Sequence, residues 1–385
     1  MATTVIVGAG IVGAALADQL AARAGGDVVI IDQSGPGLGT SRSSFGWLNA
    51  NNKQPRSYFD FSVQGMRDWS RLAREFGAPC WYQPVGNLAW ARSPQAREEL
   101  TKRVDRLREW GYRSEIVTTS RAQDLEPNVT IPSDARIAFF PDEGYVYGYQ
   151  AAQALVQRAT ARGVKLITKA EVNELVVRHN RITGVRLAHG EHIAAETVVC
   201  CAGWRSPALL APLGIDLPLA PASTPGSGAR GLTVTIEGIT PRPNRVLHTP
   251  QLHLRPNGDS RLLLEAKDID AQIDMTCGNK QLDEHAQELL MRAGMLISAA
   301  TTATIVDASL CVRALPLDGY PLIGTVPDQQ GLYIAVTHSG ITLAPTLARH
   351  ITLELSGTES PILRHYRANR TSPMILQPRP DTSSR

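Results

Sequence analysis

The sequence predicts a mixed α/β (α+β) protein in which a domain built on a parallel sheet is interrupted by a second domain built on an antiparallel sheet. Three observations predict it. A glycine-rich strand-turn-helix pattern occupies residues 5–22, a strand-glycine-helix pattern occupies residues 331–355, and a hairpin with period-2 alternation lies between them at residues 247–270. The 385 residues are enough for two or three domains.

The first pattern has the spacing of a dinucleotide-binding turn. A β-branched strand at residues 5–7 leads into Gly8, Gly10 and Gly13, and helical periodicity runs from residue 12 to residue 22. Gly8 permits the tight turn, Gly10 lets the backbone approach a pyrophosphate, and Gly13 lets the helix pack closely on the strand. We therefore expect a Rossmann-like domain, with a purely structural turn as the alternative.

The residues after the second strand favour a flavin over a nicotinamide cofactor. The strand Val28–Ile31 ends in Asp32, whose carboxylate can accept hydrogen bonds from a ribose diol. A nicotinamide domain would normally proceed soon into a third strand. Residues 35–47 instead form a second loop rich in Gly and Ser, which offers N–H groups and hydroxyls to a long cofactor or else is simply solvated.

The remaining elements of this domain are predicted from short apolar runs. Leu166–Val177 and Arg181–Leu187 are expected to form paired strands, and residues 197–203 a buried strand ending at a glycine. Gly331–Val336 is expected to be a strand that leads into a helix at about Leu343–Leu355. A second helix N-terminus aimed at the cofactor would stabilise negative charge there.

The middle of the chain predicts the second domain. In the hairpin, the polar residues His253, Arg255, Glu265 and Lys267 are predicted to share one face, directed either to the cofactor or to solvent. A charged helix at residues 97–110 is most simply a solvated face. The stretch 217–230 is predicted to link the domains, with a mobile lid as the alternative, and Tyr145, Tyr147 and Tyr149 either line a pocket or form one face of a strand.

Composition excludes several classes of protein. With 39 Lys and Arg against 36 Asp and Glu, the net charge of +3 is too close to neutral for a nucleic-acid binder. The apolar stretch at residues 5–17 is interrupted by glycines, which fits neither a signal peptide nor a membrane span. Five cysteines without a CxxC pair exclude a thiolate zinc site and a disulfide framework, so we expect no metal and a reducing compartment, the cytoplasm.

Five motifs in order carry a resemblance to a known family. They are Gly8-x-Gly10-x-x-Gly13, the loop Gly39-Thr-Ser-x-Ser-x-x-Gly46, the strand end 198–204, Arg313 with Asp318-Gly-x-Pro321-x-Ile-Gly324, and His338 to Pro345. Together they resemble the D-amino-acid oxidase superfamily of FAD-dependent amine oxidoreductases, especially its glycine oxidase and sarcosine oxidase branch. The resemblance extends from Val5 to about Leu355.

That resemblance implies a glutathione-reductase-type FAD/NAD(P)-binding fold with a discontinuous FAD domain. The FAD domain would comprise residues 1–80, 146–215 and 310–370, and the substrate domain residues 81–145 and 216–309, with a disordered tail at 371–385. The implied cofactor-binding residues are Gly8, Gly10, Ile11, Val12, Gly13, Asp32, Gln33, Thr40, Ser41, Gly46, Trp47, Leu48, Val172, Gly203, Ser339, Gly340, Ile341 and Thr342.

The resemblance also implies the candidate catalytic residues. Arg313 matches the arginine that clamps the substrate carboxylate, although an ion pair with a nearby acid such as Asp318 is the alternative. His338 would lie over the flavin face and orient or deprotonate the amine, unless it only bonds to backbone. Lys267 and His253 come from the hairpin. The oxygen-activating lysine of sarcosine oxidases is replaced by leucine, so O2 and another electron acceptor both remain open.

Cys311 matches the region of the flavin-linked cysteine of monomeric sarcosine oxidase, but a buried apolar thiol is the commoner state, so non-covalent FAD is favoured. The predicted substrate is a small amino acid or an N-substituted glycine, including an N-carboxymethyl amino acid of a biosynthetic pathway. Alternatives are an amino acid dehydrogenase, a non-catalytic FAD-binding subunit of an amine dehydrogenase, and an NAD(P)-dependent dehydrogenase. The sequence predicts no membrane partner and no particular oligomeric state.

Overall fold

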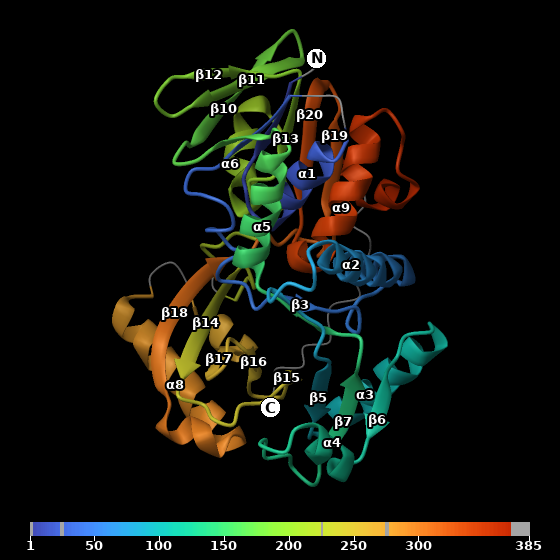
Figure 1. Cartoon of the computed structure of the whole chain (residues 1–385), viewed down its shortest axis with the longest axis vertical. Helices are drawn as coiled ribbons and strands as arrows, with labels where there is room; N and C mark the ends of the chain where they lie inside the picture. Colours follow the sequence, from blue (N-terminus) through green and yellow to red (C-terminus); the bar gives the residue numbers. More distant parts are fainter. Residues whose placement is uncertain (1–2, 24–26, 225, 274–276, 371–385) are drawn as a thin grey trace.

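The computed structural model describes residues 3–23, 27–224, 226–273 and 277–370, and two sheets stacked along the long axis dominate it (Figure 1). The predicted disordered tail lies outside the described residues. One sheet occupies the half that contains the N-terminal strand, and the other occupies the opposite half. No described helix is long and apolar enough to cross a membrane.

The first sheet has nine strands and is parallel at its centre. Its main path is β10-β11-β20-β13-β1-β2-β9, while β12 pairs with β11 and β19 pairs with β20. The strands are β1 (Thr4–Val7), β2 (Val28–Ile31), β9 (Lys165–Ile167), β10 (Val172–Arg178), β11 (Arg181–Leu187), β12 (His192–Ala194), β13 (Thr197–Cys200), β19 (Leu322–Val326) and β20 (Gln329–Val336). Because β13 pairs with both β1 and β20, segments from both ends of the chain complete one sheet.

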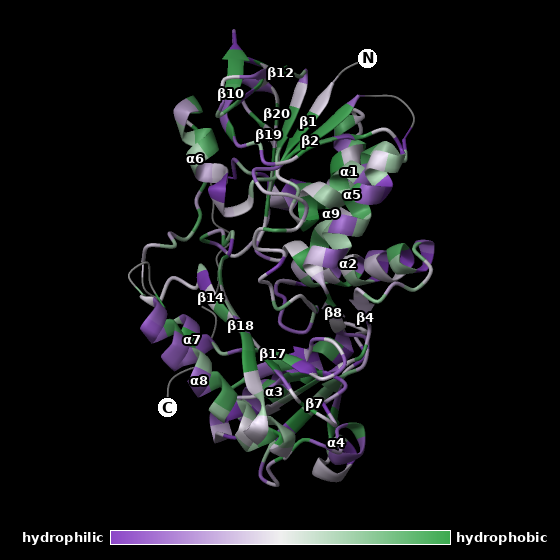
Figure 2. Ribbon diagram, turned by 60° about the vertical axis from the view of Figure 1, so that its left-hand side comes forward, coloured by the Kyte–Doolittle hydropathy of each residue, from purple (hydrophilic) through white to green (hydrophobic). Residues whose placement is uncertain are grey.

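Four helices pack beside this sheet. They are α1 (Ile11–Ala21), α2 (Arg56–Glu75), α5 (Gly148–Ala161) and α9 (Gly340–Leu355), and α1 packs against both α5 and α9. Figure 2 shows hydrophobic residues along β1 and β2 and a mixture of both kinds along α2, which is only partly buried. The short helix α6 (Ser206–Leu210) and the turns η1 (Gly203–Arg205), η2 (Ala211–Leu213) and η4 (Pro361–Tyr366) complete this half.

The predicted long strand at residues 166–177 is wrong. It is two strands: β9 pairs with β2, and β10 pairs with β11. Lys169 between them has φ +54°, a left-handed conformation that a strand cannot contain, and the Ala170 N–H donates to the Asp32 carbonyl. The strand at 197 also ends earlier than predicted, at Cys200, and the last helix begins earlier, at Gly340.

The second sheet has eight strands in the order β18-β14-β17-β16-β15-β5-β7-β6. These are β5 (Asn87–Ala91), β6 (Glu115–Val117), β7 (Arg136–Phe140), β14 (Arg230–Glu237), β15 (Val246–His248), β16 (His253–Pro256), β17 (Arg261–Glu265) and β18 (Thr304–Val312). All neighbours are antiparallel except β5 and β15, and the predicted hairpin forms β16 and β17. The predicted domain boundaries stay a prediction. Strand β18 continues across the boundary predicted at residue 310.

The two faces of this sheet meet different partners. One face packs on α8 (Asn279–Leu296), η3 (Ser298–Thr302) and α4 (Thr119–Leu125). On the other face α3 (Pro94–Glu109) lies over β5 and β7, with Leu100 and Val104 in one apolar cluster with Ala89 and Ala138. Helix α7 (Lys267–Asp270) follows β17, so Lys267 begins a helix and is not a strand residue as predicted.

A small three-stranded sheet joins the two halves. It contains β3 (Trp47–Leu48), β4 (Tyr82–Gln83) and β8 (Gly144–Val146) in the order β3-β8-β4. Tyr145 lies in β8, but Tyr147 precedes α5 and Tyr149 lies inside it, so the three tyrosines are not one face of a strand. Tyr147 and Tyr145 do contact each other, with ring centroids 5.3 Å apart.

Glu143, beside this small sheet, is fully buried and accepts hydrogen bonds from both halves. Its carboxylate oxygens receive the Trp47 indole N–H at 3.1 Å, the backbone and side-chain N–H of Asn51 at 3.2 and 2.9 Å, the Asn87 amide at 2.9 Å and the Tyr112 hydroxyl at 2.9 Å. Burial raises the pKa of Glu143, and the hydrogen bonds from Tyr112, Asn87 and Asn51 oppose that rise. The loop after β3 is therefore fastened to β5 and to the segment after α3 through one carboxylate.

We expect Glu143→Gln to destabilise the protein. The amide nitrogen of Gln is a hydrogen-bond donor, and it would face groups that are themselves donors. The free energy of unfolding in urea should fall by about 2 to 3 kcal/mol. Glu109→Gln, at the exposed end of α3, is the control and should change it by less than about 0.5 kcal/mol. Equal stability of the two variants would contradict the role assigned to Glu143.

Candidate active site

The glycines after β1 make room for a close backbone approach. Gly8 has φ +103°, and a Cβ there would lie 2.6 Å from the Cys201 carbonyl oxygen. A Cβ on Gly13 would lie 2.0 Å from the Gly8 carbonyl oxygen, so this glycine packs α1 against the strand end. Gly10 differs, because a Cβ there would meet only the Ser41 hydroxyl, at 3.5 Å. The open space at Gly10 faces a cavity that Ile11 and Val12 also line.

Asp32 organises the turns beside this cradle. One carboxylate oxygen accepts the Ala9 N–H at 2.8 Å, and the other accepts the N–H groups of Ser34 and Gly35 at 2.8 and 2.9 Å. Asp32 and Gln33 line the cavity at the end of β2, and Val172 lines it at the start of β10. These are the positions predicted for the adenosine part of a dinucleotide, and their role stays a prediction.

The Gly/Ser-rich loop connects the cradle to the second sheet. The Ser41 hydroxyl accepts the Ile11 N–H at 3.0 Å, and the Thr40 hydroxyl donates to the Val312 carbonyl at 2.6 Å. Thr40, Gly46 and Trp47 line the cavity, whereas Leu48 is buried in the core and is absent from the cavity wall, in contrast to its predicted position beside the flavin. The loop thus runs along the length expected for FAD.

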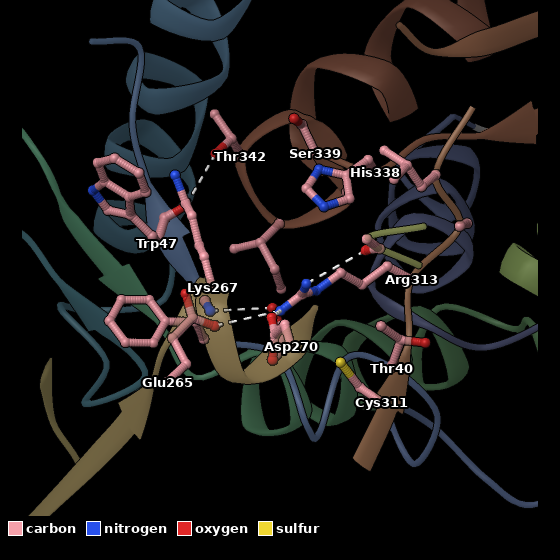
Figure 3. Close-up of a pocket in the computed structure, with 18 of the residues that line it drawn as sticks. Thr40, Trp47, Glu265, Lys267, Asp270, Cys311, Arg313, His338, Ser339 and Thr342 are labelled. Carbon is pink, nitrogen blue, oxygen red and sulfur yellow. Dashed lines mark hydrogen bonds and ion pairs between the residues drawn. The ribbon is translucent and has the colours of Figure 1, made fainter. Parts of the chain in front are cut away.

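The N-terminal end of α9 closes this part of the cavity. Ser339, Gly340, Ile341 and Thr342 line it, as does Gly203 after β13. The Thr342 hydroxyl donates to the Trp47 carbonyl at 3.2 Å (Figure 3). The Ser339 hydroxyl accepts hydrogen bonds from Lys53 at 3.0 Å and Tyr58 at 2.8 Å. Lys53 and Tyr58 were not predicted, because no motif marks them.

One continuous cavity of about 3030 Å³ joins these residues to the second sheet. Ordinary small-molecule sites enclose roughly 300–1,000 Å³, so this cavity has room for a long cofactor and a substrate together. The open approach at Gly10, the carboxylate at the end of β2 and the helix N-termini of α1 and α9 all face it. The residues present therefore fit FAD.

Arg313 lies just after β18 and lines the same cavity as the glycine cradle. Its guanidinium is 2.7 Å from the Asp270 carboxylate and 3.6 Å from that of Glu265, and it donates to the Arg230 carbonyl at 3.2 Å (Figure 3). A Cβ on Gly231 would lie 2.2 Å from it, so the glycine makes space for the side chain. The ion pair with Asp318 considered from the sequence does not form, because Asp318 binds Arg370 at 2.6 Å.

The two carboxylates beside Arg313 differ in pKa. Burial alone would raise the pKa of Glu265, but the hydrogen bond with His253, at 3.4 Å, and the charge of Arg313 outweigh it and lower the pKa. Asp270 is also buried, and burial together with the neighbouring Glu265 raises its pKa to about 6 despite the attraction of Arg313. The predicted shared face of His253 and Glu265 is confirmed by their direct pairing across β16 and β17.

His248, which the sequence reasoning left out of the site, lies at its centre. Its ring contacts the Trp47 ring, tilted by 36° with centroids 3.9 Å apart, and the His253 ring at 4.5 Å. Its Nδ1 is 2.9 Å from the Asn87 amide oxygen. Burial and the positive charges of His253, Lys267 and Arg103 hold the pKa of His248 well below its usual range, so the ring is neutral. His248 could have been found from the sequence, because it pairs with His253 across β15 and β16.

The remaining predicted residues occupy the rim and floor of this end. His338 is exposed on the loop between β20 and α9 and lines the cavity (Figure 3). Lys267 is exposed at the start of α7 and also lines it, whereas Arg255 is buried and donates to the Phe45 carbonyl. Cys311 is buried on β18 beside Arg313. Among the described residues, no group of three or more His, Cys, Asp or Glu side chains is placed to hold a metal ion.

Comparison with known proteins gives the class. Residues 3–353 match the DAO family, described as FAD dependent oxidoreductase. The chain is 26% identical over 351 residues to glycine oxidase from Geobacillus kaustophilus, which covers 88% of this chain and 89% of that protein. The crystal structure of the same enzyme superposes with a TM-score of 0.84 at 22% identity, covering 97% of this chain and 100% of that one.

Other relatives differ in length and in what they act on. Iminodiacetate oxidase from Chelativorans sp. BNC1 superposes with a TM-score of 0.81 at 22% identity, over 94% of this chain and 98% of that one. The match to 4-methylaminobutanoate oxidase (formaldehyde-forming) from Paenarthrobacter nicotinovorans, 27% identical over 216 residues, covers 56% of this chain but 26% of that longer protein.

The fold and the cavity define an FAD-binding oxidoreductase. The chain belongs to the DAO family of FAD-dependent oxidoreductases, and FAD is its cofactor. This confirms the predicted family, fold class and cofactor. The individual residue roles stay predictions.

Gly10→Ala tests the cradle. Because the added Cβ meets only the Ser41 hydroxyl at an ordinary contact distance, the free protein should keep its melting temperature. The methyl group occupies the space of the approaching pyrophosphate, so the FAD dissociation constant should rise at least about 10-fold, measured by fluorescence titration of the apoprotein. Gly278→Ala, at the start of α8 with open space around it, is the matched control. Unchanged FAD affinity in Gly10→Ala would contradict this placement.

Acid precipitation tests whether Cys311 carries the flavin. Burial raises the pKa of the Cys311 thiol, which disfavours the thiolate that a covalent link requires. We therefore expect all of the yellow colour in the supernatant, and Cys311→Ala should retain FAD. Colour in the pellet that is lost in Cys311→Ala would establish the covalent link instead.

Proposed function

We propose that this protein oxidises the C–N bond of a small amino acid or an N-substituted glycine. The α-carbon of the substrate loses a hydride, and water hydrolyses the resulting imine to an amine and an oxo acid, which is glyoxylate for an N-substituted glycine. The observation that supports this proposal best is that Arg313, whose guanidinium can pair with a substrate carboxylate, lines the same cavity as the glycine cradle.

Bound FAD would supply the hydride acceptor, flavin N5. The residues of the chain then have three tasks. Arg313 binds the substrate carboxylate with the N–H groups that Asp270, Glu265 and two backbone carbonyls do not use, and thereby orients the C–N bond. The carboxylates of Glu265 and Asp270 attract the ammonium group, and Asp270 takes its proton, since a neutral amine is needed for oxidation. The neutral His248 and the Trp47 ring wall the site and exclude water.

The electron acceptor we propose is O2, which is reduced to H2O2. The relatives named glycine oxidase support an oxidase. Lys267 and the His253 imidazole are cavity-lining groups of the hairpin region that carry or can acquire positive charge, and we assign them to the oxygen reaction. A dehydrogenase that uses another acceptor is the second candidate, because Lys267 begins α7 instead of lying on a strand over the site. The cytoplasmic location expected from the cysteine pattern belongs to this proposal as well.

The direct test is anaerobic bleaching of the yellow colour of the oxidised flavin. Glycine, sarcosine, longer N-alkylglycines and D- and L-amino acids are added in turn, with dithionite as the reference for full reduction. We expect bleaching by members of the N-alkylglycine or small amino acid series. Admitting air should restore the colour and form H2O2. No bleaching by any of these amines would contradict the proposed substrate class.

Arg313→Ala should raise KM for the bleaching substrate about 10- to 100-fold, because a charge-assisted pair with the carboxylate is lost. FAD content should stay unchanged. Arg313→Lys separates charge from geometry: it keeps a cation between Asp270 and Glu265 but loses the planar fork, so its KM should lie between those of the wild type and Arg313→Ala. An unchanged KM in both variants would remove Arg313 from substrate binding.

The raised pKa of Asp270 predicts a pH dependence. With a pKa of about 6, Asp270 is protonated below that pH and cannot accept the amine proton. kcat/KM should therefore rise with pH through about 6, and this limb should be absent from Asp270→Asn. Asp283→Asn, on the exposed side of α8, should keep it. A limb that persists in Asp270→Asn would assign the proton to another group.

A further inference from the structure

The cavity extends beyond the reacting end, along helix α3. Leu100, Arg103 and Arg106 line it there, together with Ala89 and Ala91 of β5. The prediction of a solvated face therefore holds for only part of this helix. Leu100 and Val104 pack on the sheet, and the side that carries Arg103 and Arg106 faces the cavity, because residues three apart in a helix share a face.

Arg103 and Arg106 differ from the other charged residues of α3. Lys102, which also lines the cavity, pairs with Glu98 at 2.6 Å, and Arg108 lies 3.9 Å from Asp105. The Nε–H groups of both Arg103 and Arg106 are buried, and neither has a hydrogen-bond partner in the part of the chain that the structure describes. The Glu99 carboxylate one turn away accepts instead from Gln95, at 3.1 Å.

Two neighbouring guanidinium groups in this position are costly without an anion. Burial lowers the pKa of Arg103, although an arginine still stays charged. The charges of two carboxylates, Glu143 and Glu99, act on Arg103, but both are engaged elsewhere. The Glu143 oxygens already accept hydrogen bonds from the side chains of Trp47, Asn51, Asn87 and Tyr112, and Glu99 accepts one from Gln95. Arg106 is steadied by the Trp110 ring, 5.5 Å away, which provides no negative charge. The pair therefore has cationic donors to offer a ligand.

The position of the pair relates it to the reaction. Helix α3 packs on the face of the second sheet that carries Ala89, and Ala89 pairs with His248 across β5 and β15. The charge of Arg103 helps to lower the pKa of His248, whose ring contacts that of Trp47. Arg103 and Arg313 thus line one cavity from two different walls, with the His248 and Trp47 rings on its surface as well.

We propose that Arg103 and Arg106 form a second anion-binding subsite, and that the substrate is an N-substituted glycine whose substituent ends in a carboxylate or another anionic group. This inference rests on the proposed function, in which Arg313 holds the glycine carboxylate. The electrostatics of the two walls support it: Arg313 is already flanked by Asp270 and Glu265, whereas the buried Nε–H groups of Arg103 and Arg106 meet no acceptor among the described residues. When a substrate with two anionic groups binds, its second anionic group compensates the positive charges of Arg103 and Arg106.

Substrates matched in size and different in charge test the subsite. N-propylglycine is compared with N-(2-carboxyethyl)glycine and with an N-(phosphonoalkyl)glycine, all on the holoenzyme. The wild-type kcat/KM should be at least about 10-fold higher for an anionic member. The anionic substrate with the higher kcat/KM identifies the preferred anion, carboxylate or phosphonate. A preference for either one over N-propylglycine supports the subsite. Equal or lower kcat/KM for both anionic substrates would overturn it.

Arg103→Gln should abolish that preference, measured within the variant as the ratio of kcat/KM for the anionic substrate to kcat/KM for N-propylglycine. Arg106→Gln should reduce the preference for the anionic substrate, and Arg103→Lys should retain part of that preference. Arg97→Gln is the matched control, because it removes one positive charge from an exposed position of the same helix. FAD content and melting temperature are measured for each variant. If a folded Arg103→Gln keeps the full preference, the assignment is wrong.

A binding measurement separates this proposal from the proposed function. Glutarate and butyrate, which cannot be oxidised at a C–N bond, are titrated into the holoenzyme, and the change in flavin absorbance reports binding. Glutarate should bind to the wild type at least about 10-fold more tightly than butyrate does, and this difference should disappear in Arg103→Gln. If that holds but no N-substituted glycine bleaches the flavin, the subsite stands and the proposed reaction fails. If N-propylglycine is oxidised but glutarate has no Arg103-dependent advantage, the subsite fails and the reaction stands.

Discussion

The burial of the Glu143 carboxylate is the constraint on which the rest of the site depends. A carboxyl group with no exposed surface must have its oxygens occupied, and here the donors come from β3 and the loop after it, from β5, and from Tyr112 between α3 and β6. Because those donors belong to different sheets, satisfying one carboxylate fixes the orientation of Trp47 and Asn87 together. His248 contacts both of these residues, so its position follows from the same constraint.

Charge is distributed unevenly over the walls of the cavity. At one wall Arg313 lies among Asp270 and Glu265, a grouping in which cation and carboxylates hold one another in place. At another wall Arg103 and Arg106 lie on α3 with buried N–H groups that meet no acceptor among the described residues. The first wall suits a zwitterion, because it offers both a cation and carboxylates, and the second suits an additional anion. A substrate that contacts both walls would be chosen by its charges at two ends more than by its shape.

Much of the fold was predictable because its signals are local. The glycine turn, the strand Val28–Ile31 and the hairpin at β16 and β17 each depend on neighbouring residues, and the structure confirms them. The errors occurred where a single residue changes the backbone direction, as Lys169 does between β9 and β10, or where a short helix begins directly after a strand, as α7 does at Lys267. A periodic pattern does not contain that information.

By itself, the sequence determined the family, the FAD cofactor and the close turn around Gly8, Gly10 and Gly13, and it singled out Arg313, whose role in substrate binding stays a prediction. Only the tertiary structure decided which acid meets Arg313, that His248 lies against Trp47, and that one side of α3 faces the cavity. The physical reason is that each of these contacts joins residues far apart in the chain. Local propensity specifies a strand or a helix, whereas the partner of a buried charge is specified by how whole sheets and helices pack.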